Sequence, residues 1–192
     1  MISITLLIQF LKFYIQALIT INSLYKRFMK MDMSHTKKIA GAVVLTAIAV
    51  VFSYAFFPVG PTKVYPFQHM VNAIAGIFLG PLYAIAVATA AGILRNMLGT
   101  GTVFAFPGGI PGALMVGLVY HYLWRRDYAA LTEPVGTAIG AIISGLIVAP
   151  MIGREMSIIA FLIAFLASSI PGAILGFVVV KGLRKSGFTG FE

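Results

Sequence analysis

The sequence contains no cysteine, only five acidic residues in 192, and few charged side chains of either sign. Without cysteine the chain can form no disulfide, perform no thiol redox chemistry and bind no metal through thiolates. Charged residues make up 10% of the chain, against about a quarter in soluble domains, and 60% of residues are hydrophobic, with a mean hydropathy of +0.99. This composition predicts a protein embedded in a lipid bilayer.

The sequence also lacks every catalytic motif that would suit a membrane enzyme. The Gly-x-Ser-Gly pattern of an intramembrane serine protease is absent, since Ile142 stands where Ser144-Gly145 would need the first glycine. There is no His-Glu-x-x-His pattern, no acid pair suited to acid–base or two-metal chemistry, and no nucleotide-binding glycine motif. We therefore expect no enzyme activity, no metal and no cofactor, which leaves binding or transport.

The net charge of +9 does not indicate a nucleic-acid partner. The basic residues stand at the ends of apolar runs rather than in one continuous patch. In that position they act as topology signals that face the cytoplasm and anionic lipid.

Long unbroken apolar runs, rather than alternating ones, predict an all-α fold. One segment, 67–79, is too short to cross a core of about 30 Å at about 1.5 Å per residue. It is separated from the next run by Gly80-Pro81, a turn signal. An alternative to six spans joins the runs 67–79 and 82–98 into one kinked helix and gives five spans. The six predicted spans are 39–57, 67–79, 82–98, 108–124, 133–152 and 157–180.

The distribution of basic residues favours six spans over five. Six spans with a cytoplasmic start leave only Lys63, Arg95 and Arg154 outside, whereas five would move the C-terminal basic residues outside, against the positive-inside rule. The domain then crosses the cell membrane with both of its ends on the cytoplasmic side. The residues predicted on the cytoplasmic side are Lys37, Lys38, Arg125, Arg126, Lys181, Arg184 and Lys185.

The chain divides into an N-terminal extension (1–33), the six-helix membrane domain (34–185) and a short cytoplasmic tail (186–192). In the extension, polar residues recur at spacings of three and four, which predicts an amphipathic helix lying along the membrane interface. Alternatively, the start codon is misassigned, because Met29, Met31 and Met33 each precede a short basic leader. The polar stripe consists of Thr5, Gln9, Lys12, Gln16 and Thr20.

Polar side chains at membrane depth are costly, and here they form two clusters. Gln68, His69 and Asn72 crowd one side of the second span, and Arg95-Asn96 ends the third. Because a hairpin brings these two positions to one membrane face, we expect them to form a solute pocket beneath an external loop. The alternative is a set of interhelical hydrogen bonds that hold the bundle together. We expect the acidic residues Asp127 and Glu133 at the opposite face of the membrane.

The loop after Arg95 carries further candidate ligand contacts. Thr100 offers a hydroxyl, and Phe104 and Phe106 offer faces that can stack on a flat ring. The alternative is a lid or interfacial loop with aromatic anchors. In the first span, Ala42, Thr46, Ala49 and Ser53 form a stripe of small residues that lets another helix approach closely, either within the bundle or from a partner subunit.

At these motifs the sequence resembles the ThiW family, substrate-binding (S) components of energy-coupling factor transporters. The resemblance covers about 37–185 and lies mainly in Pro66-Phe-Gln-His-Met-Val-Asn72, Leu79-Gly-Pro81, Arg95-Asn-Met-Leu-Gly-Thr-Gly-Thr102 and Phe106-Pro-Gly108. It implies a six-helix S-component fold that captures a small-molecule vitamin precursor, the thiazole precursor of thiamine (hydroxyethylthiazole), on the external side. It also implies a transmembrane coupling subunit, which would dock on the small-residue stripe, and two cytoplasmic ATPases.

Two other functions are compatible with the residues. One is a stand-alone channel or uniporter, which would move solute without ATPase subunits. The other is a structural membrane subunit that binds no ligand.

Overall fold

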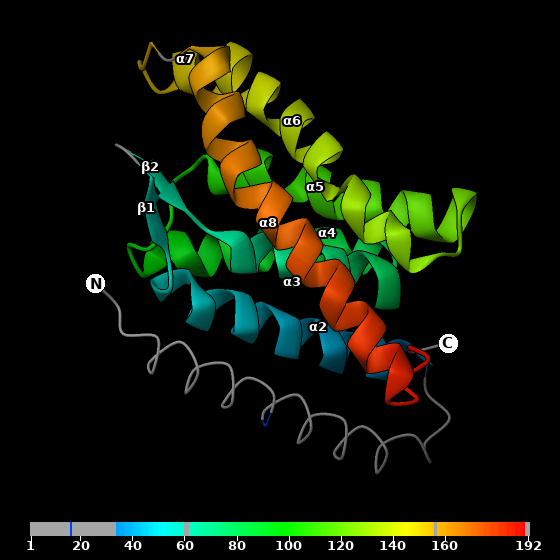
Figure 1. The fold of residues 1–192 in the computed structure, drawn as a ribbon. Coiled ribbons are helices and arrows are strands. Elements are labelled where there is room, and N and C mark those ends of the chain that lie inside the picture. The colour runs from blue at the N-terminus through cyan, green and yellow to red at the C-terminus, as the bar shows by residue number, and fades with distance from the viewer. Residues whose placement is uncertain (1–15, 17–33, 60–61, 156, 191–192) are drawn as a thin grey trace. The chain divides into compact units, whose positions relative to one another are not determined.

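The computed structural model describes residues 16, 34–59, 62–155 and 157–190. The helices are α2 (Ser34–Val51), α3 (Pro66–Phe78), α4 (Pro81–Met97), α5 (Ala105–Leu118), α6 (Glu133–Ile143), α7 (Ala149–Met151) and α8 (Ile158–Lys185) (Figure 1). Short 3-10 or π segments extend them: η1 (Phe52–Tyr54), η2 (Val119–Leu123), η3 (Asp127–Thr132) and η4 (Ser144–Val148). Strands β1 (Phe57–Val59) and β2 (Thr62–Val64) form an antiparallel hairpin between α2 and α3.

The all-α prediction is confirmed. In the described part of the chain, the helices and their extensions make six continuous segments that correspond to the six predicted spans. Three of them are long and apolar enough to cross a membrane by themselves: His35–Tyr54, Asp127–Met151 and Ile158–Lys185. The 13 residues of α3 extend over only about 20 Å. The number of complete crossings therefore stays a prediction.

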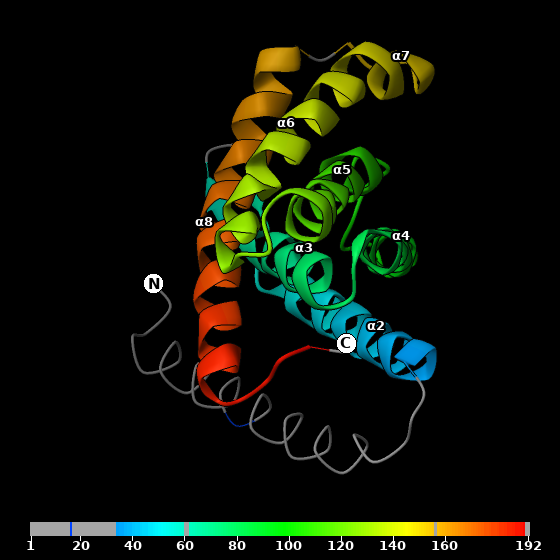
Figure 2. The same ribbon diagram turned by 90° about the vertical axis from the view of Figure 1, so that its right-hand side faces the viewer.

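α3 and α4 form a hairpin rather than one kinked helix. α3 ends at Phe78, Gly80 adopts a φ of +93°, and Pro81 begins α4. A side chain is strained at such a φ, so glycine suits this turn, and proline is tolerated in the first helical turn because it needs no N–H there. Figure 2 shows α3 beside α4 and α5, with α4 and α5 viewed nearly along their axes.

α3 lies along only one half of the longest helix, α8. Its first turn packs on the middle of α8, where Gly172 lies against the backbone of Pro66 and the Cβ of His69. Its last turn reaches the end of α8, where the Arg184 guanidinium lies 5.5 Å from the Phe78 ring centroid. The N-terminal turn of α3 is therefore at about the middle of α8, and not at its N-terminal end.

Glycines allow α5 and α6 to cross at very short range. A Cβ on Gly136 or Gly140 would overlap the carbonyl oxygen of Pro111 or Pro107, respectively. The carbonyl of Pro107 has no helical partner four residues on, because Pro111 carries no N–H. This small-xxx-small pattern on α6 is the usual way that membrane helices approach each other closely.

The end of the bundle that holds the C-terminus of α8 is tied together by one arginine. The Arg184 Nε donates to Asp127 Oδ1 at 2.6 Å, and its Nη2 donates to the Tyr120 hydroxyl. Beyond α8 the chain turns back at Gly187 (φ +86°), and Phe188 packs edge-on against Phe78 at 4.8 Å. These contacts join the last turns of α3 and α8 to η2 and to the start of η3.

Lys38–Glu192 form one compact unit, and the contacts described here lie within it. The predicted interfacial helix of the N-terminal extension falls outside the described residues, apart from the helical and exposed Gln16.

Candidate functional site

The start of α3 and the end of α4 meet as the hairpin prediction requires. The Arg95 Nη1 donates to Gln68 Oε1, and the guanidinium carbon lies 4.4 Å from the ring centroid of Tyr65, just before α3. Arg95 is only 2% exposed, and Gln68 only 7%. A buried arginine in an apolar bundle needs such partners, since an unpaired charge there would be very unfavourable.

The loop after α4 completes the environment of Arg95. Gly99 adopts a φ of +71°, and the amides of Gly99 and Thr100 donate to the carbonyls of Asn96 and Arg95, which is the Schellman pattern that ends a helix. This turn places the Thr100 carbonyl 3.3 Å from Arg95 Nη2. The Thr100 hydroxyl lies 2.9 Å from that of Ser53, so a chain of hydrogen bonds connects η1, which continues α2, to Arg95.

Asn96 has a structural contact instead of facing the cluster. Its Nδ2 donates to the carbonyls of Gly92 at 2.8 Å and Thr102 at 3.0 Å. The side chain therefore fixes the loop to α4, and the sequence prediction that it contacts a ligand stays untested.

The second half of the cluster is centred on a carboxylate that the sequence analysis placed elsewhere. Glu133 Oε1 accepts hydrogen bonds from His69 Nδ1 at 2.7 Å, Asn72 Nδ2 at 3.1 Å and Thr137 Oγ1 at 3.1 Å. Glu133 is fully buried, and His69 and Asn72 are 5% and 1% exposed.

The expectation that Glu133 lies on the opposite face from His69 and Asn72 is therefore wrong. The helical segment begins at Asp127 rather than at Glu133, and its first six residues form a 3-10 helix, so Glu133 lies about 12 Å inside it. The short α3 also starts halfway along α8, which brings His69 to the same depth. A sequence signal was present: Glu133 is the last charged residue before an uncharged run that extends to Arg154.

Glycines on α5 make the space for these polar groups. A Cβ on Gly112 would overlap Glu133 Oε1, and a Cβ on Gly109 would lie 2.6 Å from Gln68 Nε2. The Gly109 carbonyl accepts a hydrogen bond from Asn72 Nδ2 at 3.1 Å. The glycine-rich start of α5 therefore serves as the backbone wall of the polar cluster.

Three buried polar atoms in this region lack a hydrogen-bond partner among the described residues: Arg95 Nε, Glu133 Oε2 and Ser169 Oγ. Ser169, on α8, was not among the predicted site residues. It shares a helix face with Phe165, which packs on Gly108, and with Gly172, which packs on His69. Buried polar atoms in proteins are nearly always paired, so each such atom indicates a position where a ligand or water can bind.

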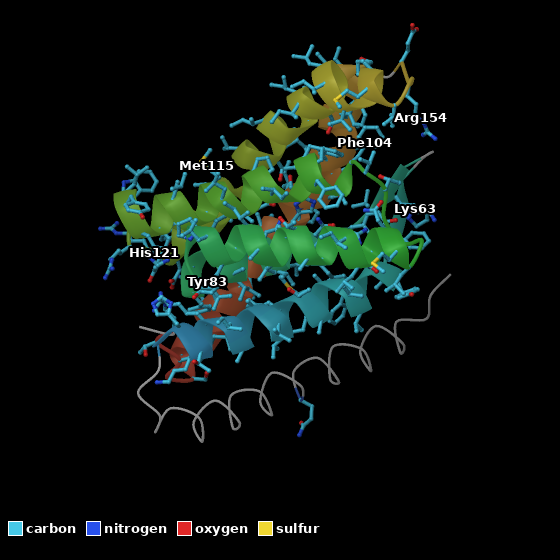
Figure 3. The ribbon with its side chains drawn as sticks, turned by 180° about the vertical axis from the view of Figure 1, so that it is seen from behind. Lys63, Tyr83, Phe104, Met115, His121 and Arg154 are labelled. Atoms are coloured by element: carbon cyan, nitrogen blue, oxygen red, sulfur yellow. The ribbon has the colours of Figure 1, made fainter. Side chains whose placement is uncertain are left out.

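The two predicted stacking residues contact different helices. Phe104 lies 4.7 Å from Phe161 of α8 in an apolar cluster with Phe165, and Phe106 packs on Gly92 of α4. Figure 3 shows Phe104 toward the end of the bundle that carries Lys63 and Arg154, away from His121 and Tyr83. The two rings therefore lie in different surroundings: Phe104 belongs to an aromatic cluster, and Phe106 packs against α4.

The small-residue stripe, which runs along α2 into η1, is divided by burial. Ala49 and Ser53 are 2% and 4% exposed, whereas Ala42 and Thr46 are half-buried. Packing against other parts of this chain therefore accounts for Ser53, which bonds to Thr100. Docking of a partner subunit on the stripe stays a prediction.

Comparison with known proteins identifies the family. The sequence matches the model of the ThiW family, described as thiamine-precursor transporter protein, over residues 39–186. The match covers well over half of the chain, and the chain therefore belongs to this family of membrane transporters. This confirms the resemblance found from the motifs and agrees with the absence of enzymatic motifs. No curated protein matches the sequence.

Proposed function

We propose that this member of the ThiW family is the substrate-capture subunit of an energy-coupling factor importer. It binds the thiazole precursor of thiamine, hydroxyethylthiazole, on the external side of the membrane. The observation that carries the proposal is the buried polar cluster around Arg95 and Glu133, which is enclosed by glycine-rich helices in an otherwise apolar bundle.

The chemistry of the cluster suits a small heterocyclic alcohol. A thiazole presents a ring nitrogen that accepts a hydrogen bond, a hydroxyl that both donates and accepts, and an aromatic face. The Arg95 Nε–H can supply a donor, Glu133 Oε2 an acceptor and Ser169 Oγ either. The aromatic cluster of Phe104, Phe161 and Phe165 supplies apolar surface next to Gly108, which Thr137 links to Glu133.

Binding is tested by calorimetry on the purified protein with hydroxyethylthiazole. We expect saturable binding of one ligand and a higher apparent melting temperature in its presence. Absence of binding to this ligand and to the other thiamine precursors would refute capture of a precursor at this site and favour a structural subunit.

The need for partners is tested by transport into vesicles. A substrate-capture subunit should bind the precursor but import it only when the transmembrane coupling subunit and both ATPases are present. Uptake by the chain alone would instead support a channel or uniporter.

Docking of the coupling subunit on α2 is tested by enlarging the stripe. Ala42→Leu places a bulky side chain on its half-buried part, and should reduce coupled uptake while leaving precursor binding intact. Ala160→Leu, at an exposed alanine of α8, is the matched control. Ala49→Leu is a poorer choice because Ala49 is buried, and overpacking would destabilise the fold itself.

The proposed orientation is testable because the chain contains no native cysteine. Lys63 and Arg126 are both exposed and lie on β2 and directly before η3, respectively. In intact cells, a membrane-impermeant maleimide should label Lys63→Cys and spare Arg126→Cys. The reverse pattern would place the Arg95 end of the bundle in the cytoplasm.

A further inference from the structure

The two carboxylate oxygens of Glu133 differ in their hydrogen bonds. Oε1 receives all three hydrogen bonds, from His69, Asn72 and Thr137, whereas Oε2 has no partner among the described residues. The side chain is completely buried at the level where the first turn of α3 meets the middle of α8. A single oxygen left unpaired in such a position is unfavourable until a donor reaches it.

The contacts on Oε1 are all made by hydrogen-bond donors. Three donors converge on one oxygen, and the shortest, His69 Nδ1 at 2.7 Å, has the length of a charge-assisted bond. With Oε1 saturated, the remaining oxygen can act only as a hydrogen-bond acceptor. It also carries negative charge into a region of low dielectric constant, where it repels other anions strongly.

The neighbouring donors Asn72 and Thr137 are already engaged with other acceptors as well as with Oε1. The Asn72 amide is shared between Oε1 and the Gly109 carbonyl, and Thr137 also contacts the Gly108 carbonyl at 3.3 Å. Gly112 lies against Oε1, and a Cβ added to it would overlap that oxygen. A ligand is therefore the natural source of the missing donor.

We infer that Glu133 is a specificity-determining residue whose Oε2 accepts a hydrogen bond from a hydroxyl of the bound precursor. The site thereby selects the free alcohol over an ether, which has no proton to donate. For a phosphate ester, the repulsion from the Glu133 carboxylate opposes the attraction from Arg95. This inference rests on the proposed function and specifies the form of the substrate that it captures.

The test exchanges the acceptor for a donor. In Glu133→Gln the amide oxygen keeps the place of Oε1 because three donors hold it there, so an N–H₂ group takes the place of Oε2. Calorimetry compares hydroxyethylthiazole, its methyl ether and its phosphate on the wild-type protein and on this variant. Glu155→Gln is the matched control, because Glu155 is exposed.

The wild-type protein should prefer the alcohol over the methyl ether by about 10- to 100-fold, the range of one hydrogen bond to a charged group. In Glu133→Gln this ratio should fall at least about ten-fold, since the amide can donate to the ether oxygen. Binding of the phosphate should strengthen. The steric effect of the extra methyl group is the same in both proteins and cancels in the comparison. Glu155→Gln should behave as the wild type.

Three outcomes would overturn the inference. The first is an alcohol-to-ether ratio that Glu133→Gln leaves unchanged, which removes Glu133 from the recognition of the hydroxyl while leaving the proposed function intact. The second, which needs no variant and so does not depend on its folding, is equal binding of alcohol and ether by the wild-type protein. The third is the absence of binding to any of these compounds, which overturns the proposed function as well.

Discussion

The close crossing of α5 and α6 makes a specific prediction for Gly140→Ala. The added Cβ would overlap the carbonyl oxygen of Pro107, which is backbone and cannot rotate away as a side chain would. Relief requires α6 to move off α5, and that movement also separates Thr137 from Gly108. The substitution therefore affects both the stability of the bundle and the position of the polar cluster.

The size of the effect follows from two opposed contributions. Overpacking costs about 1–3 kcal/mol of folding stability. Gly140→Ala should cost about 3 kcal/mol, because the Pro107 carbonyl that its Cβ would meet is backbone and rigid. Replacing glycine by alanine inside a helix returns about 1 kcal/mol. The net loss of about 2 kcal/mol corresponds to a decrease of about 4–8 °C in melting temperature for a chain of this size.

The assay is the apparent melting temperature of the purified protein in detergent, with Gly182→Ala as the control. Gly182 also lies within a helix, α8, but a Cβ there meets no other atom within 4 Å. This variant should gain about 0.5–1 kcal/mol and melt about 1–4 °C higher. If Gly140→Ala were to rise in parallel with Gly182→Ala, the close α5–α6 contact would be refuted.

Three further substitutions test contacts around the site and at the opposite end of the bundle. Arg184→Met should lower the apparent melting temperature by about 2–8 °C, because Asp127 loses its partner; a value within error of the wild type would show that this pair contributes nothing. Arg95→Lys should weaken precursor binding by at least about ten-fold in calorimetry, because an ammonium cannot reproduce the planar set of contacts; unchanged affinity would remove Arg95 from the site. Ser53→Ala should cost about 1 kcal/mol, or about 2–4 °C, through loss of its bond to Thr100, and no change in melting temperature would exclude a stabilising role for that contact.

Much of the architecture could be predicted from local sequence. The apolar runs are long and continuous, and in lipid the backbone of such runs must form helices. The distribution of the basic residues then favoured six spans over five. Gly80-Pro81 required a turn, and the hairpin it produces brings Gln68 to Arg95. The sequence also predicted a partner for Arg95, because a charge at membrane depth is costly, whereas its burial is a finding of the structure.

The central carboxylate shows what the sequence alone could not provide. Whether Glu133 meets His69 depends on how deep each lies, and depth is set by the start of η3 at Asp127 and by the position of the short α3 along α8. The separation of Phe104 from Phe106 and the burial of Ser53 likewise depend on which neighbouring helix occupies each side. Periodicity assigns residues to a helix face. Only the packing between helices decides which faces meet and at what depth in the bundle. That packing depends on glycine contacts between segments far apart in the chain.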